Sequence, residues 1–515
     1  MQVLRTKTVE QSIKDTEEPG RQLRRSLGAV QLTAIGIGVI IGTGIFVLTG
    51  EAAGTLAGPA IAISFAVSAI VCLLAGLCYA EFASVVPVAG SAYTFSYASL
   101  GELMAWIIGW DLMLELALGA ATVSSGWSQY FKVVLTSAPW HANPPAWIFA
   151  DHHNLVAAVV VLAITGLLCF GLRTSSAVNG VIVAIKLVIV LLVIVAGLFY
   201  IRSANYHPFI PPAGAKPAPG GSASHTLLQD LGASPGAFGI GGIFSGAALV
   251  FFAFIGFDIV ATNAEETRKP ARDVPIAIFA SLAICTVLYV AVSLVVTGMV
   301  KYNHIDVAAP LSSAFISVHQ HTIATIVAYG ALAGLTSVIL VLLMGQSRVF
   351  FAMSRDHLLP PVFSAVSARF GTPYRTTLVT GVAVAAMTFL FPLKTLADLV
   401  NIGTLFAFVL VAIGVTFLRR SRPGLERPFR TPFVPVLPIL SVLASVWLML
   451  NLQGATWVRF GVWMAVGLVV YFAYSVRHSR LAGSSGSAGA AGSSGSGGAA
   501  GSSGSGTGEA PPGGG

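Results

Sequence analysis

Long apolar stretches alternate with short polar segments along most of this chain. Twelve of these stretches approach or reach the roughly 17–25 residues that a helix needs to cross a bilayer. The pattern therefore predicts an all-α integral membrane protein with twelve transmembrane helices. The predicted spans are 27–50, 58–80, 104–133, 154–172, 177–201, 237–262, 275–300, 322–347, 376–393, 397–418, 433–451 and 459–476.

The composition agrees with this pattern. Hydrophobic residues make up 55% of the chain and charged residues 9%, with a mean hydropathy of +0.84. A soluble domain carries about 25% charged residues. With a cytosolic N-terminus and twelve alternating spans, 21 of the 28 Lys and Arg residues lie on the cytosolic side. This positive-inside asymmetry accounts for the net charge of +8 without a nucleic acid partner, and it predicts that both termini are cytosolic.

The spans group into two blocks of five and a final pair. A Pro- and Gly-rich segment separates the two blocks, and the C-terminal segment is almost entirely Gly, Ser and Ala, which is typical of disorder. We expect no cleaved signal peptide, because no apolar run with a cleavage site begins the chain. The predicted organisation is a cytosolic segment 1–26, a first repeat 27–201, an outer loop 202–236, a second repeat 237–418, helices 11 and 12 in 433–478, and a disordered cytosolic tail 482–515.

Two apolar segments far apart in the chain are interrupted by glycines. The first runs from Gly36 to Phe46 (GIGVIIGTGIF), and the second runs from Gly239 to Asp258. Unpaired backbone at membrane depth is tolerated where it lines a cavity. Paired breaks of this kind indicate the substrate site of a secondary transporter built from inverted repeats. We therefore expect helices 1 and 6 to be broken and to open two five-helix repeats.

The two breaks offer opposite chemistry. Unwinding at Ile41-Gly42-Thr43-Gly44 would expose N–H groups at the start of a half-helix, which favour a carboxylate. A break at Ile255-Gly256 would free carbonyls that can receive an ammonium. Together they suit the α-carboxylate and α-amine of an amino acid. The alternative is close helix packing through small residues. We prefer packing for Gly36, Gly38, Gly239 and Gly242, and ligand binding for Gly42, Gly44 and Gly256.

Lys186 lies near the middle of the fifth span, with no acidic residue nearby in sequence. A lysine at that depth must face the protein interior. Its ammonium could fill a cation site permanently beside the carbonyls of the first helix, or it could exchange protons during the transport cycle. A structural ion pair with Glu115 or Asp258 is the alternative.

Three carboxylates within the predicted spans are the other candidates for a charged function. Asp111 and Glu115 are four residues apart in the third span and hence share a helix face. Either can accept protons or pair with a cationic substrate, and Asp111 can equally be an interfacial acid. Asp258 follows the second break, where it caps the half-helix or takes part in coupling. The sequence contains no phosphate-binding Gly-x-x-x-x-Gly-Lys-Ser/Thr motif and suggests no metal site, cofactor or enzyme.

Several segments resemble the cationic amino acid transporter family of the amino acid–polyamine–organocation superfamily. They are GIGVIIGTGIF from Gly36, YAEFASVVPVAGSAYTFSY from Tyr79, GELMAWIIGWDLMLE from Gly101, GFDIVATNAEETRKPARDVP from Gly256 and QSRVFFAMSRDHLLP from Gln346. The resemblance covers about residues 25–478. With twelve spans, the chain is similar to the bacterial members.

The resemblance implies a leucine-transporter-like 5+5 inverted repeat followed by two helices. It places the substrate carboxylate at the segment of Ile40, Thr43 and Gly44, and the amine at that of Phe252, Ala253 and Ile255. It also implies that Lys186 stands in for a sodium ion, which favours proton coupling. The candidate substrate-binding residues are Ile40, Ile41, Gly42, Thr43, Gly44, Phe252, Ala253, Phe254, Ile255 and Gly256, and the candidate coupling residues are Lys186, Glu115, Asp258 and Asp111.

Together these observations predict a proton-coupled amino acid permease of a bacterial inner membrane that works by alternating access. An amino acid or polyamine exchanger is the alternative within transport, and a non-transporting sensor is the alternative outside it. A channel is a third alternative, and it would show flux that does not saturate with substrate. The expected partners are a small amino acid, protons and the lipid bilayer. The side-chain preference, the oligomeric state and any small membrane subunit stay open.

Overall fold

The computed structural model describes residues 27–85, 93, 96–97, 101–137, 140–150, 152–171, 176–220, 225–233, 236–365 and 372–479. Within these residues the protein is helical, and β-structure is limited to two isolated bridges, Leu27–Thr267 and Thr226–Gln453. The expectations for the N-terminal segment 1–26 and for the Gly/Ser/Ala tail lie outside the described residues. The all-α class is confirmed.

Eight helical stretches of the described part are long and apolar enough to cross a membrane. They are Gly44–Val85, Glu102–Thr136, Gly180–Leu198, Gly239–Ala261, Pro270–Met299, His321–Arg355, Leu393–Ser421 and Gly454–His478. Four shorter apolar helices accompany them: Ala29–Ile40, Leu155–Cys169, Tyr374–Leu390 and Val436–Leu450. Each of the twelve predicted windows contains one of these helices or a part of one. The count of twelve crossings stays a prediction.

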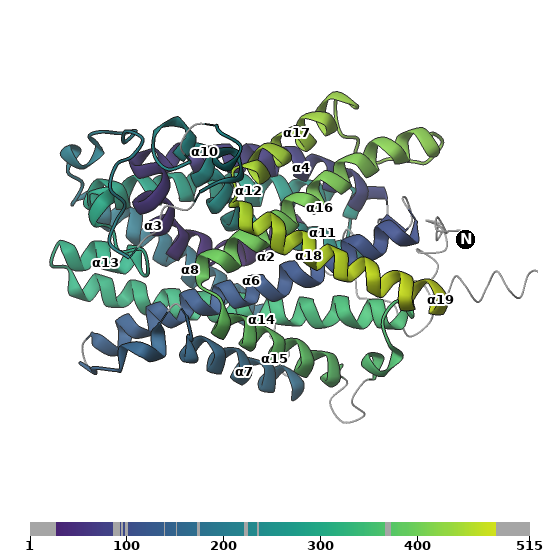
Figure 1. The fold of residues 1–515 in the computed structure, drawn as a ribbon, viewed down its shortest axis with the longest axis horizontal. Coiled ribbons are helices and arrows are strands. Elements are labelled where there is room, and N and C mark those ends of the chain that lie inside the picture. Colours follow the sequence, from purple (N-terminus) through teal and green to yellow (C-terminus); the bar gives the residue numbers. More distant parts are fainter. Residues whose placement is uncertain are drawn as a thin grey trace, which may run out of the picture.

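Most helices run along the long axis of the molecule (Figure 1). At its centre α6 (Glu102–Thr136) packs against α14 (His321–Arg355) and α16 (Leu393–Ser421), while α4 (Ile61–Val85) packs against α12 (Pro270–Met299). The helices α7 (Leu155–Cys169) and α15 (Tyr374–Leu390) lie side by side along the lower edge in Figure 1. This scaffold surrounds the two interrupted helices.

The loop between the two blocks contains little regular structure in its described part. It forms a 3₁₀ turn over Ser203–Tyr206 and a four-residue helix, α9, over Leu227–Asp230. The Pro- and Gly-rich composition predicts irregular chain here, since proline removes donors and glycine destabilises helices. A short helix that the apolar pattern does not predict, α13 (Pro310–Ser317), precedes α14.

Candidate functional site

The first apolar segment is interrupted where its glycines cluster. The helix α2 (Ala29–Ile40) ends at Ile40, and Ile41 is extended, with φ −72° and ψ 96°. The chain turns back to helix at Thr43 and continues as a π-helical turn, Gly44–Leu48. The N–H groups that begin such a half-helix have no partners within it. The predicted break in the first helix is confirmed.

The second segment is interrupted as well. The helix α10 (Gly239–Val250) tightens to a 3₁₀ turn over Phe251–Phe254, Ile255 is extended, and a new short helix, α11 (Phe257–Thr262), follows. Gly256 has a φ of +114°, a conformation that side chains disfavour. A Cβ at this position would lie 2.6 Å from Cγ1 of Val39. Glycine is therefore required here both by conformation and by contact with α2.

The two breaks meet in space. A Cβ on Gly44 would lie 2.2 Å from Cα of Ala253, so this glycine allows the backbones of the two broken helices to touch. A Cβ on Gly42 would meet nothing closer than 3.6 Å. Gly44 is therefore required for packing of the two helices and Gly42 is not, although the sequence analysis assigns the same role to both. Gly36, Gly38 and Gly242 are also tightly packed, each with a neighbouring atom within 3 Å of the added Cβ.

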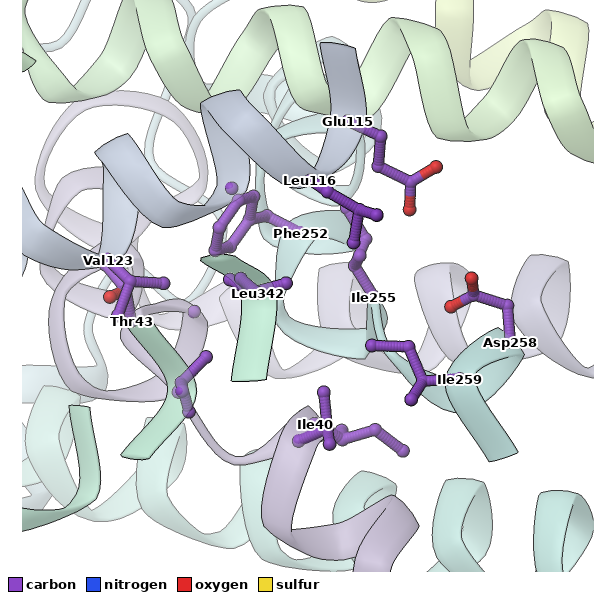
Figure 2. Close-up of a pocket in the computed structure, with 15 residues that line it drawn as sticks. Ile40, Thr43, Glu115, Leu116, Val123, Phe252, Ile255, Asp258, Ile259 and Leu342 are labelled. Atoms are coloured by element: carbon purple, nitrogen blue, oxygen red, sulfur yellow. The ribbon is translucent and has the colours of Figure 1, made fainter. Parts of the chain in front are cut away.

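A small cavity of about 30 Å³ lies between the breaks (Figure 2). A space of this size is too small for an amino acid, so the site must widen to admit one. Apolar side chains form most of its wall, and the polar side chains in the wall are those of Thr43, Glu115 and Asp258. The lining residues are Val39, Ile40, Gly42, Thr43, Gly44, Glu115, Leu116, Gly119, Val123, Phe252, Ile255, Asp258, Ile259, Val338 and Leu342.

The structure divides the residues predicted to bind substrate. Those that line the cavity are Ile40, Gly42, Thr43, Gly44, Phe252 and Ile255. Those that do not are Ile41, Ala253, Phe254 and Gly256, which are the neighbours that shape the two breaks. Of the predicted coupling residues, Glu115 and Asp258 line the cavity, whereas Lys186 and Asp111 lie outside it.

Thr43 is the most informative residue in the cavity wall. Its side chain is fully buried, and its hydroxyl has no hydrogen-bond partner among the described residues. A buried hydroxyl without a partner is unfavourable by about 1–3 kcal/mol. Together with the first N–H groups of the half-helix, it leaves an unfilled set of donors at the first break.

The two carboxylates occupy the other side of the cavity, away from Thr43 (Figure 2). Asp258 lies in the first turn of α11, and its carboxylate interacts with backbone N–H groups of that turn. Glu115 comes from α6. Neither carboxylate pairs with a Lys or Arg within the part of the chain that the structure describes. The site can therefore hold protons or a cationic group at this end.

Lys186 is fully buried on α8 (Ser176–Leu198) and donates to the carbonyl oxygen of Gly38 at 2.6 Å. Gly38 belongs to the last turn of α2, where carbonyls lose their helical partners. Gly334 on α14 makes room for the lysine, because a Cβ there would lie 3.0 Å from Cγ of Lys186. The alternative of an ion pair is not observed, since no described acidic residue pairs with this ammonium.

Asp111 is separated from the cavity by one turn of α6. It is fully buried, and neither of its carboxylate oxygens has a hydrogen-bond partner among the described residues. A Cβ on Gly403 of α16 would lie 2.8 Å from its Oδ1. Its burial shows that the protein shields it from its surroundings, and its depth in the membrane, including the interfacial position, stays a prediction.

Three residues that the sequence analysis does not single out bond to carbonyls in the two interrupted helices. The Tyr289 hydroxyl of α12 lies 2.8 Å from the oxygen of Ile40 and 3.0 Å from that of Ala253, so it connects both broken helices. Asn401 donates to the oxygens of Ala248 and Leu249, and Tyr130 donates to that of Phe46. A polar side chain in the middle of an apolar span is the signal that could have identified them.

Comparison with known proteins agrees with this architecture. The family described as "Amino acid permease" matches residues 27–473. The branched-chain amino acid permease BcaP of Bacillus subtilis is 47% identical over 491 residues, covering 93% of this chain and 99% of that protein. The methylthioribose transporter of the same species is 44% identical over 470 residues, covering 90% and 96%. The vacuolar cationic amino acid transporter 2 of Arabidopsis thaliana is 31% identical over 600 residues, covering 90% and 91%.

Proposed function

The chain belongs to the amino acid permease family, whose members are multi-pass membrane transporters and not enzymes, and we propose that it carries its substrate by proton-coupled symport with alternating access. The substrate binds between the two broken helices. The observation that carries this proposal is the unfilled set of donors at the first break. Gly42, Thr43 and Gly44 line the same cavity as Phe252 and Ile255 of the second break, and the Thr43 hydroxyl has no hydrogen-bond partner among the described residues.

The two breaks bind the two charged groups of an amino acid. The N-terminal end of the half-helix at Gly42–Gly44 receives the α-carboxylate, which the helix dipole and the free donors favour. The carbonyls of the segment from Phe252 to Ile255 receive the α-amine. Within that segment, the carbonyl oxygen of Ala253 already lies within hydrogen-bond distance of the Tyr289 hydroxyl. The carbonyl oxygen of Phe252 already accepts from the N–H of Ile255 at 3.2 Å. The substrate amine therefore competes for these two oxygens with hydrogen bonds that the protein itself makes.

The cavity wall favours an aliphatic, neutral side chain. Leu116, Val123, Val338 and Leu342 contribute apolar surface to the cavity wall. A relative named as a branched-chain amino acid permease shares 47% of its residues with this chain, whereas a relative named as a cationic amino acid transporter shares 31%. We assign the carboxylates of Glu115 and Asp258 to proton coupling, not to a substrate cation.

Lys186 is the proposed link to protons. Its ammonium occupies the place of a bound cation next to the last turn of α2, two residues before the break. Protonated Lys186 holds the Gly38 carbonyl through a charge-assisted hydrogen bond, and loss of the proton weakens that bond and loosens the first half-helix. Glu115 and Asp258 take up protons at the cavity, and Asp111 extends this acidic series one turn along α6.

Uptake into proteoliposomes tests the coupling. We expect the wild type to accumulate a branched-chain amino acid when an inward proton gradient is imposed, and Lys186→Ala to lose accumulation while it still binds substrate in a thermal-shift assay. Lys132→Ala, at an exposed lysine of α6, is the matched control. Normal concentrative uptake by Lys186→Ala would overturn the role of this lysine. Dependence on internal amino acid without any effect of pH would support exchange instead.

The membrane arrangement is part of the same proposal. The two broken helices open two inverted five-helix repeats, 27–201 and 237–418, and α17 (Val436–Leu450) and α18 (Gly454–Val470) follow. Twelve crossings place both termini in the cytosol of a bacterium and the protein in its inner membrane. Labelling of single cysteines introduced at 202–220 and at 422–430 with a membrane-impermeant reagent tests this. Labelling of both segments from the same side of the membrane would contradict it.

A further inference from the structure

A second hollow, separate from the substrate cavity, lies between α16 and α17. Its volume is about 380 Å³, and it shares no lining residue with the cavity at the breaks. The two helices pack against each other, but the small residue Ala412 and the short Thr416 leave a gap between them. The hollow is therefore an open groove on the side of the molecule.

The walls of the groove are apolar and exposed. Ile413 and Phe417 line it from α16 and are about half exposed, at 49% and 50%. Ile439 and Leu443 line it from α17 and are exposed at 52% and 60%. In a membrane, such a surface is covered by lipid chains. A groove differs from a flat helix face because it contacts one chain from two sides.

One charged residue, Arg420, lines the groove at its end near the C-terminus of α16. Arg420 follows Thr416 by four residues and so continues the same helix face. Its side chain is exposed and has no hydrogen bond or ion pair to the protein within the described residues. The groove thus combines apolar walls with the positively charged guanidinium of Arg420 at one end.

Two neighbouring arginines are already engaged by the protein. Arg419 pairs with Glu81 at 2.7 Å and donates to the oxygen of Thr431 at 2.8 Å. Arg427 donates to the oxygen of Arg422 at 2.7 Å. Arg420 is thus not a member of this network. Its guanidinium remains available to a partner from outside the chain.

We propose that this groove binds one anionic phospholipid, with an acyl chain between α16 and α17 and the headgroup phosphate on Arg420. Guanidinium groups bind phosphate through paired, charge-assisted hydrogen bonds. Basic pockets between helices on the cytoplasmic side recognise anionic headgroups. The proposed orientation puts Arg420 at the cytosolic surface, where it meets the inner leaflet. Lipid binding in detergent does not depend on transport or orientation, so it can fail independently of the proposed function.

Native mass spectrometry of the delipidated protein tests the site. The protein is titrated with phosphatidylglycerol or with phosphatidylcholine that carries the same acyl chains. We expect the wild type to bind one phosphatidylglycerol in preference to phosphatidylcholine. Arg420→Gln should lower the apparent affinity for phosphatidylglycerol about fivefold, the effect of one basic residue at a membrane surface. Arg430→Gln, at an exposed arginine outside the groove, is the matched control.

A second variant tests the groove itself. Val442→Trp fills the channel between the helices and should reduce binding of phosphatidylglycerol while the melting temperature and substrate binding of the protein are retained. Equal binding of the two lipids by the wild type would overturn the proposal. Equal losses in Arg420→Gln and Arg430→Gln would also overturn it, because they would indicate general attraction of lipid to basic side chains. Unchanged binding by a folded Val442→Trp protein would exclude the groove as the site.

Discussion

The two breaks are treated differently by the protein around them. At the second break, Asn401 donates to the oxygens of Ala248 and Leu249, and the oxygen of Ala253 shares the single Tyr289 hydroxyl with that of Ile40. At the first break, Lys186 and Tyr289 hold the oxygens of Gly38 and Ile40, but the Thr43 hydroxyl has no partner among the described residues. Side chains thus donate to carbonyls of both broken helices, whereas the Thr43 hydroxyl at the first break has no partner among the described residues.

This difference explains how an interrupted helix can be stable and still bind a ligand. Every freed backbone group in a membrane interior needs a partner. Side chains from α8, α12 and α16 donate hydrogen bonds to carbonyl oxygens near the breaks. These bonds stabilise the shape of both breaks without substrate. In the proposed function, the substrate's carboxylate would satisfy the donors left at the first break. Three substitutions test this division, from the largest expected effect to the smallest.

Gly256→Ala should produce the largest effect, and it should act on stability. The added methyl group meets a φ of +114° and the Val39 side chain, which together should lower the free energy of unfolding by about 2–4 kcal/mol. Thermal unfolding in detergent measures this. Gly42→Ala is the control, since its Cβ has room. Equal melting temperatures for the two variants would show that the second break is not held by its glycine.

Tyr289→Phe should weaken both breaks at once. Removal of the hydroxyl leaves the oxygens of Ile40 and Ala253 without this donor, at a loss of about 1–3 kcal/mol in the free energy of unfolding. Tyr329→Phe removes a hydroxyl that bonds to Trp140 at an exposed position and should change stability by less than about 0.5 kcal/mol. If both variants melt alike, Tyr289 does not join the two breaks.

Thr43→Val should act on binding and spare the fold. The wild-type hydroxyl has no partner to lose among the residues that the structure describes, so the melting temperature without substrate should stay the same or rise. Loss of its bond to a carboxylate should weaken substrate affinity by roughly tenfold or more. Thr49→Val is the control, because the Thr49 hydroxyl already donates to the oxygen of Ile45 at 2.9 Å. Wild-type affinity in Thr43→Val would contradict the assignment of the first break to the carboxylate.

Much of the site could be predicted because its signals are local. Glycines within an apolar run predict a break at that position, and the helix α2 ends at Ile40 as the GIGVIIGTGIF segment indicates. A lysine in an apolar span must be shielded from lipid, and Lys186 is fully buried. Asp258 follows a break and interacts with backbone N–H groups of the next helix. Each inference needs only the depth and the type of a residue.

The partners of these residues could not be predicted in the same way. Gly42 and Gly44 look equivalent in sequence, yet Gly44 touches Ala253 and Gly42 lines the cavity. The same holds for the acidic residues, since Glu115 faces the cavity and Asp111, one turn away, does not. Helical periodicity places both on one face but does not say where the cavity ends along that face.

By itself, the sequence determined that this protein is a helical membrane protein with an interrupted first helix, a buried lysine and acidic residues at membrane depth. These properties follow from the cost of placing polar groups in lipid, which acts on each residue separately. Only the tertiary structure decided that the breaks touch, that Lys186 bonds to Gly38 across 148 positions, and that Tyr289 reaches Ile40 across 249 positions. Such pairings depend on how whole helices pack, and a local pattern of apolar and polar residues does not specify that packing.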